Sequence, residues 1–132
     1  MPSSADDLAL VPLFADLSGR QRRKLAANFR ERTFKPGTDV VREGSMSGVG
    51  FFVVTNGEAT VSVDGAEVRT LTAGDHFGEL ALITKAARTA TVTARTELHC
   101  LEIAFSDFRE FARANPDVTW KLLQHVVALL QR

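Results

Sequence analysis

The chain contains a single cysteine, Cys100, among its 132 residues, which excludes an intramolecular disulfide and a cysteine-rich metal site. Cys100 lies in the alternating segment 97–103, and this pattern predicts a strand thiol rather than a nucleophile. An excess of positive charge is also lacking, since the 16 lysines and arginines are balanced by 16 aspartates and glutamates. The chain therefore has no general attraction for nucleic acid or anionic lipid, and any anion must be bound locally.

Long apolar runs are absent as well. No stretch approaches the roughly 20 residues needed to cross a bilayer. The polar start, residues 1–7, lacks the basic and then apolar layout of a signal peptide, so we expect a cytoplasmic protein that does not bind membranes. Hydrophobic residues make up 45% of the chain, enough for a packed core, and the length predicts one domain over residues 1–132.

The order of elements predicted is helices, then short strands, then helices. Ser18 and Gln21 fit a capping box and predict a helix from about Gly19 to Phe29, preceded by a shorter amphipathic stretch over residues 5–10. These helices would fill about residues 1–30. From Thr33 to Ile103, turn residues separate short runs rich in valine, phenylalanine and threonine, which predicts an antiparallel sandwich or barrel over about residues 32–104.

Two strand pairs stand out in this region. Asp64-Gly65 predicts a type I′ hairpin that joins residues 59–63 to residues 66–71. Residues 90–94 and 97–103 look like a second pair.

The last segment, residues 106–132, predicts two helices. Ser106 is expected to cap the first, and Asn115 with Pro116 to start the second. The second helix would place five apolar residues on one face, namely Val118, Leu122, Val126, Leu129 and Leu130.

One segment between the strands departs from the strand pattern. Residues 79–83 are strong helix formers that follow Gly78, which predicts a single helical turn inside the β region. The free N–H groups at the start of such a turn can hold a phosphate. Gly78 would let the phosphate come close, Arg88 offers a two-pronged cation and Thr89 a hydroxyl.

Glu79 narrows the ligand class. A carboxylate beside a phosphate repels the ligand unless the ligand also offers hydroxyl hydrogens, as a ribose does. The sequence has no Walker-type Gly-Lys-Ser/Thr motif, so a compact nucleotide is favoured over a magnesium-bound triphosphate.

Residues 77–92, FGELALITKAARTATV, closely resemble the phosphate-binding cassette of cyclic nucleotide-binding domains, such as those of catabolite gene activator proteins, protein kinase A regulatory subunits and cyclic nucleotide-gated channels. Residues 10–25 resemble the helical entry of the family, residues 34–37 and 42–44 its early turns, and residues 50–63 its glycine-marked hairpin. The resemblance implies a mainly β fold with flanking helices, an eight-stranded antiparallel jelly roll whose C-terminal helix acts as a lid.

The resemblance also implies the roles of individual residues. Glu79 would accept from the ribose 2′-hydroxyl, and Arg88 would bind the cyclic phosphate. Ser45 stands where the family often has aspartate, from which we expect only a local change in that turn. The full implied ligand site consists of Phe77, Gly78, Glu79, Leu80, Arg88, Thr89 and Ala90, with backbone contacts from Gly78, Leu80 and Ala90 and a hydroxyl contact from Thr89.

The function expected is that of a regulatory sensor, not an enzyme, which binds cyclic AMP, or else cyclic GMP, and signals through its C-terminal helix. Thr89 does not separate the two ligands, because threonine follows the arginine in binders of both. His76, His99 and His125 are too widely spaced to suggest a metal cofactor.

Several alternatives stay open from the sequence. Glu79 and Arg88 could form an ion pair that binds nothing, in a ligand-free protein-interaction module of the same fold. The chain could also be the sensor part of a longer transcription regulator, channel or enzyme. No helix-turn-helix follows the last helix, so direct binding of nucleic acid is not expected. The effector is left open, as is a homodimer through the C-terminal helix.

Overall fold

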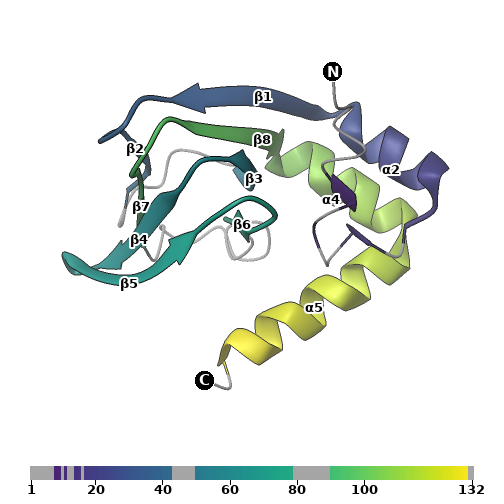
Figure 1. The fold of residues 1–132 in the computed structure, drawn as a ribbon. Helices are drawn as coiled ribbons and strands as arrows, with labels where there is room; N and C mark the ends of the chain where they lie inside the picture. Colours follow the sequence, from purple (N-terminus) through teal and green to yellow (C-terminus); the bar gives the residue numbers. More distant parts are fainter. Residues whose placement is uncertain are drawn as a thin grey trace.

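The computed structural model describes residues 8–9, 11, 14–15, 17–42, 50–78 and 90–130, with only the backbone described at residues 122, 125, 126, 129 and 130. Figure 1 shows the elements along the chain. In order they are α2 (Gly19–Ala26), β1 (Phe29–Phe34), β2 (Asp39–Val41), β3 (Gly50–Asn56), β4 (Ala59–Val63), β5 (Ala66–Leu71), β6 (His76–Phe77), β7 (Thr91–Ala94), β8 (Leu98–Ala104), α4 (Phe105–Ala114) and α5 (Pro116–Leu130).

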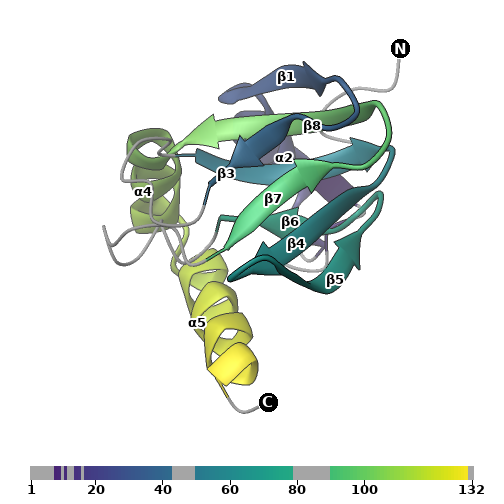
Figure 2. The same ribbon diagram turned by 90° about the vertical axis from the view of Figure 1, so that its left-hand side faces the viewer.

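The eight strands of the described residues form two antiparallel four-stranded sheets. Their orders are β1-β8-β3-β6 and β2-β7-β4-β5. Figure 2 shows the two sheets facing each other, with α4 and α5 beside them. This arrangement is the jelly roll that the family resemblance implied, so the expected fold class is confirmed.

In the sheet β1-β8-β3-β6, strand β3 is buried on both faces, because its apolar residues point alternately to either side. Phe51 and Val53 belong to a core shared with the helices, which also holds Leu25 of α2, Phe108 of α4 and Val118 of α5. Phe52 and Val54 belong to a second core between the two sheets. We call these the helix-side core and the inter-sheet core.

The first described helix begins as predicted and ends earlier than predicted. The capping box of Ser18 and Gln21 is present in full. The predicted end at Phe29 is wrong, since α2 stops at Ala26 and Phe29 starts β1 opposite Ile103. Phe29 is still buried in the helix-side core, so its apolar spacing to Leu25 reflects a shared core and not one helix. The jelly roll accordingly begins at residue 29.

The hairpin at Asp64-Gly65 is confirmed. Both residues have positive φ, 52° and 81°, as the two central positions of a type I′ turn require. The flanking strands β4 and β5 have the predicted bounds and pair with each other.

The other two predicted pairings are wrong. β7 pairs with β2 and β4, whereas β8 pairs with β1 and β3, so the strands around residues 95–97 lie in different sheets. β3 and β4, expected as a hairpin over residues 50–63, also lie in different sheets. Both short connections cross between the sheets instead of reversing within one.

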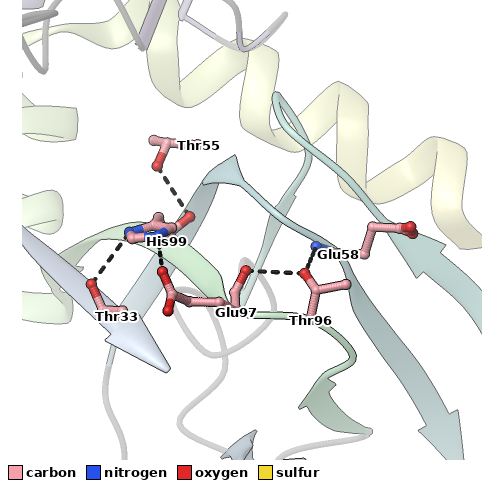
Figure 3. Close-up of polar contacts among 6 residues, drawn as sticks. All are labelled: Thr33, Thr55, Glu58, Thr96, Glu97 and His99. Carbon is pink, nitrogen blue, oxygen red and sulfur yellow. Dashed lines mark hydrogen bonds and ion pairs between the residues drawn. The ribbon is translucent and has the colours of Figure 1, made fainter. Parts of the chain in front are cut away.

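The two crossing connections are bonded to each other, as part of the network in Figure 3. The carbonyl of Glu58 accepts from the N–H groups of Arg95 and Thr96 at 2.9 and 3.3 Å. The N–H of Glu58 donates to Oγ1 of Thr96 at 3.0 Å. This pairing closes one end of the jelly roll.

The two C-terminal helices are present, with one correction. α4 begins at Phe105 after Ala104, without a side-chain cap, so the expected cap at Ser106 is wrong because that residue lies inside the first turn. α5 begins at Pro116 as predicted. Within the described residues, no helix is both long enough and apolar enough to cross a membrane.

Candidate ligand-binding site

The predicted cassette, residues 77–92, runs from the end of β6 into the start of β7. Phe77, Gly78 and Ala90 are described, while the segment 79–89 is not. Four of the predicted site residues, Glu79, Leu80, Arg88 and Thr89, therefore lie outside the described residues and remain predictions, as does the expected helical turn over residues 79–83. The structure gives the two ends of the cassette and the surface beside them.

Phe77 fixes the start of the cassette in the inter-sheet core. Its ring stacks on Phe52 with centroids 4.8 Å apart and planes within 6°, and only 7% of Phe77 is exposed. Gly78 follows with a φ of 94°, a left-handed conformation that favours glycine. The ring of Phe77 is thus occupied by the core, and Gly78 offers its backbone without a side chain.

His76, the other residue of β6, contacts the opposite core. Its ring lies 5.3 Å from the ring of Phe51. Phe51 in turn contacts Phe14 at 6.0 Å and Phe108 of α4 at 5.6 Å. Strand β6 therefore places the ring of His76 against the helix-side core and the ring of Phe77 in the inter-sheet core.

The end of the cassette leads onto an apolar surface between the sheets. Ala90 is half-buried, and β7 starts directly after it. Val92 of β7 lies opposite Val41 of β2 on one side and Val61 of β4 on the other. Val92 is buried, whereas Val41 and Val61 are half-buried against the inter-sheet core. We call these three residues the valine row, a surface suited to a flat apolar group such as a purine.

Arg69 lies at the end of the valine row, and no motif in the sequence had indicated it. It lies directly opposite Val61, so both side chains are on the same face of the sheet. Leu71, two residues on, is buried in the inter-sheet core and confirms that this is the inner face. Arg69 itself is exposed. The alternation of β5 could have placed Arg69 on the face of Leu71, had that face been recognised as the inner one.

A second charged group lies on the inner face of the other sheet. Glu102 of β8 is opposite Phe52, in the same row as Phe77. Its Oε1 accepts from Arg32 at 2.5 Å and from Arg30 at 3.2 Å. The side chain of Glu102 is only 13% exposed, and the two guanidinium groups offset its loss of hydration.

Cys100, two residues before Glu102, is the strand thiol that the sequence predicted. It is buried in the inter-sheet core. Burial raises the pKa of the Cys100 thiol from its ordinary 9.0 to about 12, with Arg32 lowering it and Glu102 raising it to smaller extents. The thiol is therefore protonated at neutral pH and is a poor nucleophile.

Comparison with known proteins decides the family. A sequence profile of the cyclic nucleotide-binding domain matches residues 31–115. The chain belongs to the cyclic nucleotide-binding domain family. The profile includes the predicted cassette, so the resemblance noted from residues 77–92 is confirmed at the level of the family.

Relatives of this cyclic nucleotide-binding domain occur in kinases and their regulators. The chain is 41% identical over 101 residues to a cAMP-dependent protein kinase regulatory subunit of Yarrowia lipolytica, covering 75% of this chain and 27% of the relative. It is 38% identical over 96 residues to a cGMP-dependent protein kinase of Toxoplasma gondii, covering 73% of this chain and 10% of the relative. The domain thus spans about a quarter or less of the length of these relatives.

A solved structure shows the same architecture. The regulatory domain of Toxoplasma gondii protein kinase A, crystallised with cAMP, superposes with a TM-score of 0.83 and 27% identity, covering 95% of this chain and 48% of that one. The chain is therefore a cyclic nucleotide-binding domain of the regulatory type, with the jelly roll expected of it.

Proposed function

We propose that this domain binds cyclic AMP through the cassette at residues 77–92. Arg88 pairs with the cyclic phosphate, Glu79 accepts from the ribose 2′-hydroxyl, and Thr89 donates its hydroxyl. Gly78, Leu80 and Ala90 contribute backbone groups, and Phe77 fixes the segment to the core. The observation that carries the proposal is the pairing of a buried anchor at Phe77 with a glycine of positive φ at Gly78, at the start of a segment with the family's cassette sequence.

The valine row supplies the surface for the base in this proposal. Val41 and Val61 are half-buried and lie two strands apart, on either side of Val92. A purine that covered them would remove apolar area from water, at a gain of roughly 25 cal/mol per Å². The protein kinase A regulatory domain that was crystallised with cAMP supports this choice of ligand.

Cyclic GMP is a second candidate, and Arg69 is the observation that favours it. A guanine base presents two neighbouring acceptors, O6 and N7, which an arginine can contact with both prongs of its guanidinium group. Adenine has an amino group, which is a hydrogen-bond donor, in place of O6, so it cannot accept both hydrogen bonds from the arginine. Arg69 stands exposed at the end of the valine row, within the described residues that carry the base surface. The similarity to a cGMP-dependent protein kinase also supports this candidate.

The domain acts as a sensor and carries out no reaction of its own in this proposal. The ligand shifts the position of α5, and it can do so only by its difference in affinity for the two positions. The α5 side chains Trp120, Leu123 and Val127 are 62%, 48% and 43% exposed and form an apolar stripe with helical spacing. We infer that this stripe packs against the nucleotide-bound cassette or against a second copy of the domain.

The wider context follows from the relatives. We propose that the domain is a cytoplasmic regulatory module whose output acts on an effector in a longer protein or a separate chain. The alternative is a ligand-free module that uses the same fold for protein interaction.

Parallel titrations test the proposal. The domain is titrated with cyclic AMP, cyclic GMP and cyclic dinucleotides by calorimetry, with 5′-AMP as the control that has the same base and an open phosphate. We expect tight binding of a cyclic mononucleotide and at least a hundredfold weaker binding of 5′-AMP. A binding ligand at 100 times its Kd would also stabilise the fold by about 2.7 kcal/mol and raise the Tm. No heat and no change in Tm at millimolar concentrations would leave the ligand-free module as the function.

A further inference from the structure

A groove between α2 and α4 has walls of opposite charge. Its volume is about 400 Å³, and Figure 1 shows the two helices next to each other. Arg20 and Lys24 line the groove from α2, and Asp107 and Glu110 line it from α4. All four side chains are exposed. We call the first pair the basic wall and the second pair the acidic wall.

Each wall carries a single sign of charge because of the way its helix is built. The two residues of the basic wall are four positions apart on α2, and the two of the acidic wall are three positions apart on α4. These spacings place both members of a wall on the same side of their helix. α2 contains no acidic residue, and Arg109 of α4 lies instead over the ring of Phe105, 5.4 Å from its centroid.

A hydrogen bond between side chains holds the two helices together at this groove. Nε2 of Gln21 donates to Oδ1 of Asn115 at 2.8 Å, and this bond is half-buried. Oε1 of Gln21 also accepts from the N–H of Ser18 at 3.0 Å, and Nδ2 of Asn115 donates to the carbonyl of Phe111 at 2.9 Å. Each amide is thus fixed by two bonds, so the walls are held at a set spacing before any partner binds.

The two walls do not neutralise each other. Among the described residues, no basic group of one wall lies within 4.0 Å of an acidic group of the other. The ion pairs that the structure describes lie elsewhere, for example between Arg32 and Glu102 on neighbouring strands. A partner that pairs with both walls must therefore carry both signs of charge. Nucleic acid or an anionic membrane carries one sign only and would be repelled by the acidic wall.

A second copy of this chain carries the required pattern. A two-fold axis that enters the groove between α2 and α4 places the basic wall of each copy against the acidic wall of the other, so each contact is made twice. The 16 basic and 16 acidic residues of the chain balance, so no net charge opposes the approach of two copies at neutral pH. We propose that the α2–α4 groove is the interface of a homodimer held by these reciprocal charge contacts.

This contact is separate from the proposed nucleotide site, because none of its residues belongs to the cassette or to the valine row. Dimerisation and nucleotide binding can therefore each fail alone. Exposed ion pairs contribute little individually, and salt screens them. The dimer is accordingly expected to be weak and to depend on salt.

Sedimentation equilibrium of the wild type tests the salt dependence. Raising the ionic strength from about 0.1 M to about 1 M shortens the Debye length from about 10 Å to about 3 Å. We expect the dimer to dissociate at least about tenfold more readily at the higher ionic strength. A protein that stays monomeric at about 1 mM in the lower salt overturns the proposal, as does a dimer whose Kd does not change with salt.

Two charge reversals test the walls. Arg20→Glu with Lys24→Glu makes both walls acidic, and Asp107→Lys with Glu110→Lys makes both walls basic. Each variant alone should dimerise at least about tenfold more weakly, because like charges then meet in both halves of the interface. An equimolar mixture should dimerise as tightly as the wild type, because opposite charges meet again in both halves. A mixture as weak as its separate components, with both components folded by circular dichroism, overturns the proposal.

A milder variant decides the question if a reversal unfolds the domain. Asp107→Asn with Glu110→Gln removes the charge of the acidic wall and introduces no repulsion. We expect it to weaken the dimer by at least about threefold. An unchanged Kd in this variant overturns the proposal.

Arg109→Glu with Arg113→Glu is the matched control. It changes the net charge by the same amount as the reversal of the basic wall, on α4 but outside the residues that line the groove. Its Kd should stay within about twofold of the wild type. A loss equal to that of the basic-wall reversal would assign the effect to net charge and overturn the proposal. A dimer that tolerates both wall reversals lies on another surface, such as the apolar stripe of α5, and overturns it as well.

Discussion

Gly57 faces the carbonyl oxygen of Glu97 so closely that a Cβ atom at position 57 would lie 2.2 Å from it. Gly57 belongs to the connection from β3 to β4, and Glu97 to the connection from β7 to β8. Both connections cross from one sheet to the other and bond to each other through Glu58 and Thr96. Close contact of two backbones is thus part of how this end of the jelly roll closes.

Gly57→Ala should destabilise the domain by about 2–4 kcal/mol, because the φ of 91° is strained for alanine and the new methyl group meets backbone. Urea unfolding followed by circular dichroism measures the loss. Gly37→Ala is the matched control, since its φ is 87° and nothing lies within 4 Å of the added atom. It should lose about 1 kcal/mol from strain alone. Equal losses in the two variants would show that the contact with Glu97 adds nothing.

Arg88→Leu should weaken cyclic nucleotide binding by about 2–5 kcal/mol, or roughly thirtyfold to several thousandfold, because a charged partner of the phosphate is lost. Calorimetry on both proteins measures the change. Arg95→Leu is the control, since Arg95 is exposed in the connection from β7 to β8, at the end of β7 away from the cassette. Unchanged affinity in Arg88→Leu would remove this residue from the site.

Glu79→Gln should weaken binding of the ribose form more than binding of the 2′-deoxy form. The carboxylate is proposed to accept from the 2′-hydroxyl, and the deoxy ligand has no such group. Titration of both proteins with both ligands gives a double cycle with an expected coupling of about 1.5–3 kcal/mol. A uniform loss for both ligands would mean that Glu79 only shapes the loop.

Arg69→Ala should weaken cyclic GMP by about 1–3 kcal/mol and leave cyclic AMP within twofold, because only guanine offers the paired acceptors. Competition titrations with the two nucleotides measure the ratio. Val68→Ala is the control, a neighbour on β5 that is 58% exposed and not part of the valine row. An equal effect of Arg69→Ala on both nucleotides would assign the residue to the phosphate or to the fold.

Cys100 should make the domain less stable in alkali. Its thiol has a pKa of about 12 in the folded state against 9.0 ordinarily, so the folded state binds the proton more tightly than the unfolded state. The resulting stabilisation is complete below about pH 9 and is lost as the pH rises toward 12, by at most about 1.4 kcal/mol per pH unit. Cys100→Ala should show a shallower decline of unfolding free energy between pH 9 and 11. Parallel curves for the two proteins would contradict the shift.

Two local features of the fold were predicted correctly from the sequence, whereas two strand pairings were not, and neither were the cap at Ser106 and the helix end at Phe29. The capping box at Ser18 and the turn at Asp64-Gly65 depend on a few adjacent residues, and both are as predicted. The short connections at residues 57–58 and 95–97 have the length and composition of hairpin loops. Whether the chain reverses within a sheet or crosses to the other depends on contacts such as that of Gly57 with Glu97, which no local pattern contains.

The candidate site also combines features that are local in the sequence with features that depend on distant pairings. The cassette was identified from a contiguous run of residues, and its ligand contacts stay predictions. Arg69 was not predicted because its proposed contact with the base requires it to lie on the inner face of β5. The pairing of β5 with β4 determines which face of β5 is the inner one. The Gln21–Asn115 bond joins residues 94 positions apart and could not be read from either neighbourhood alone.

The two residues of β6 lie on opposite faces of their sheet, with the ring of His76 against Phe51 and the ring of Phe77 against Phe52. Since they are adjacent in the chain, a tilt of this short strand moves both rings together, in opposite senses. Strain at the proposed nucleotide site would in this way reach Phe108 through a single intervening aromatic ring, Phe51.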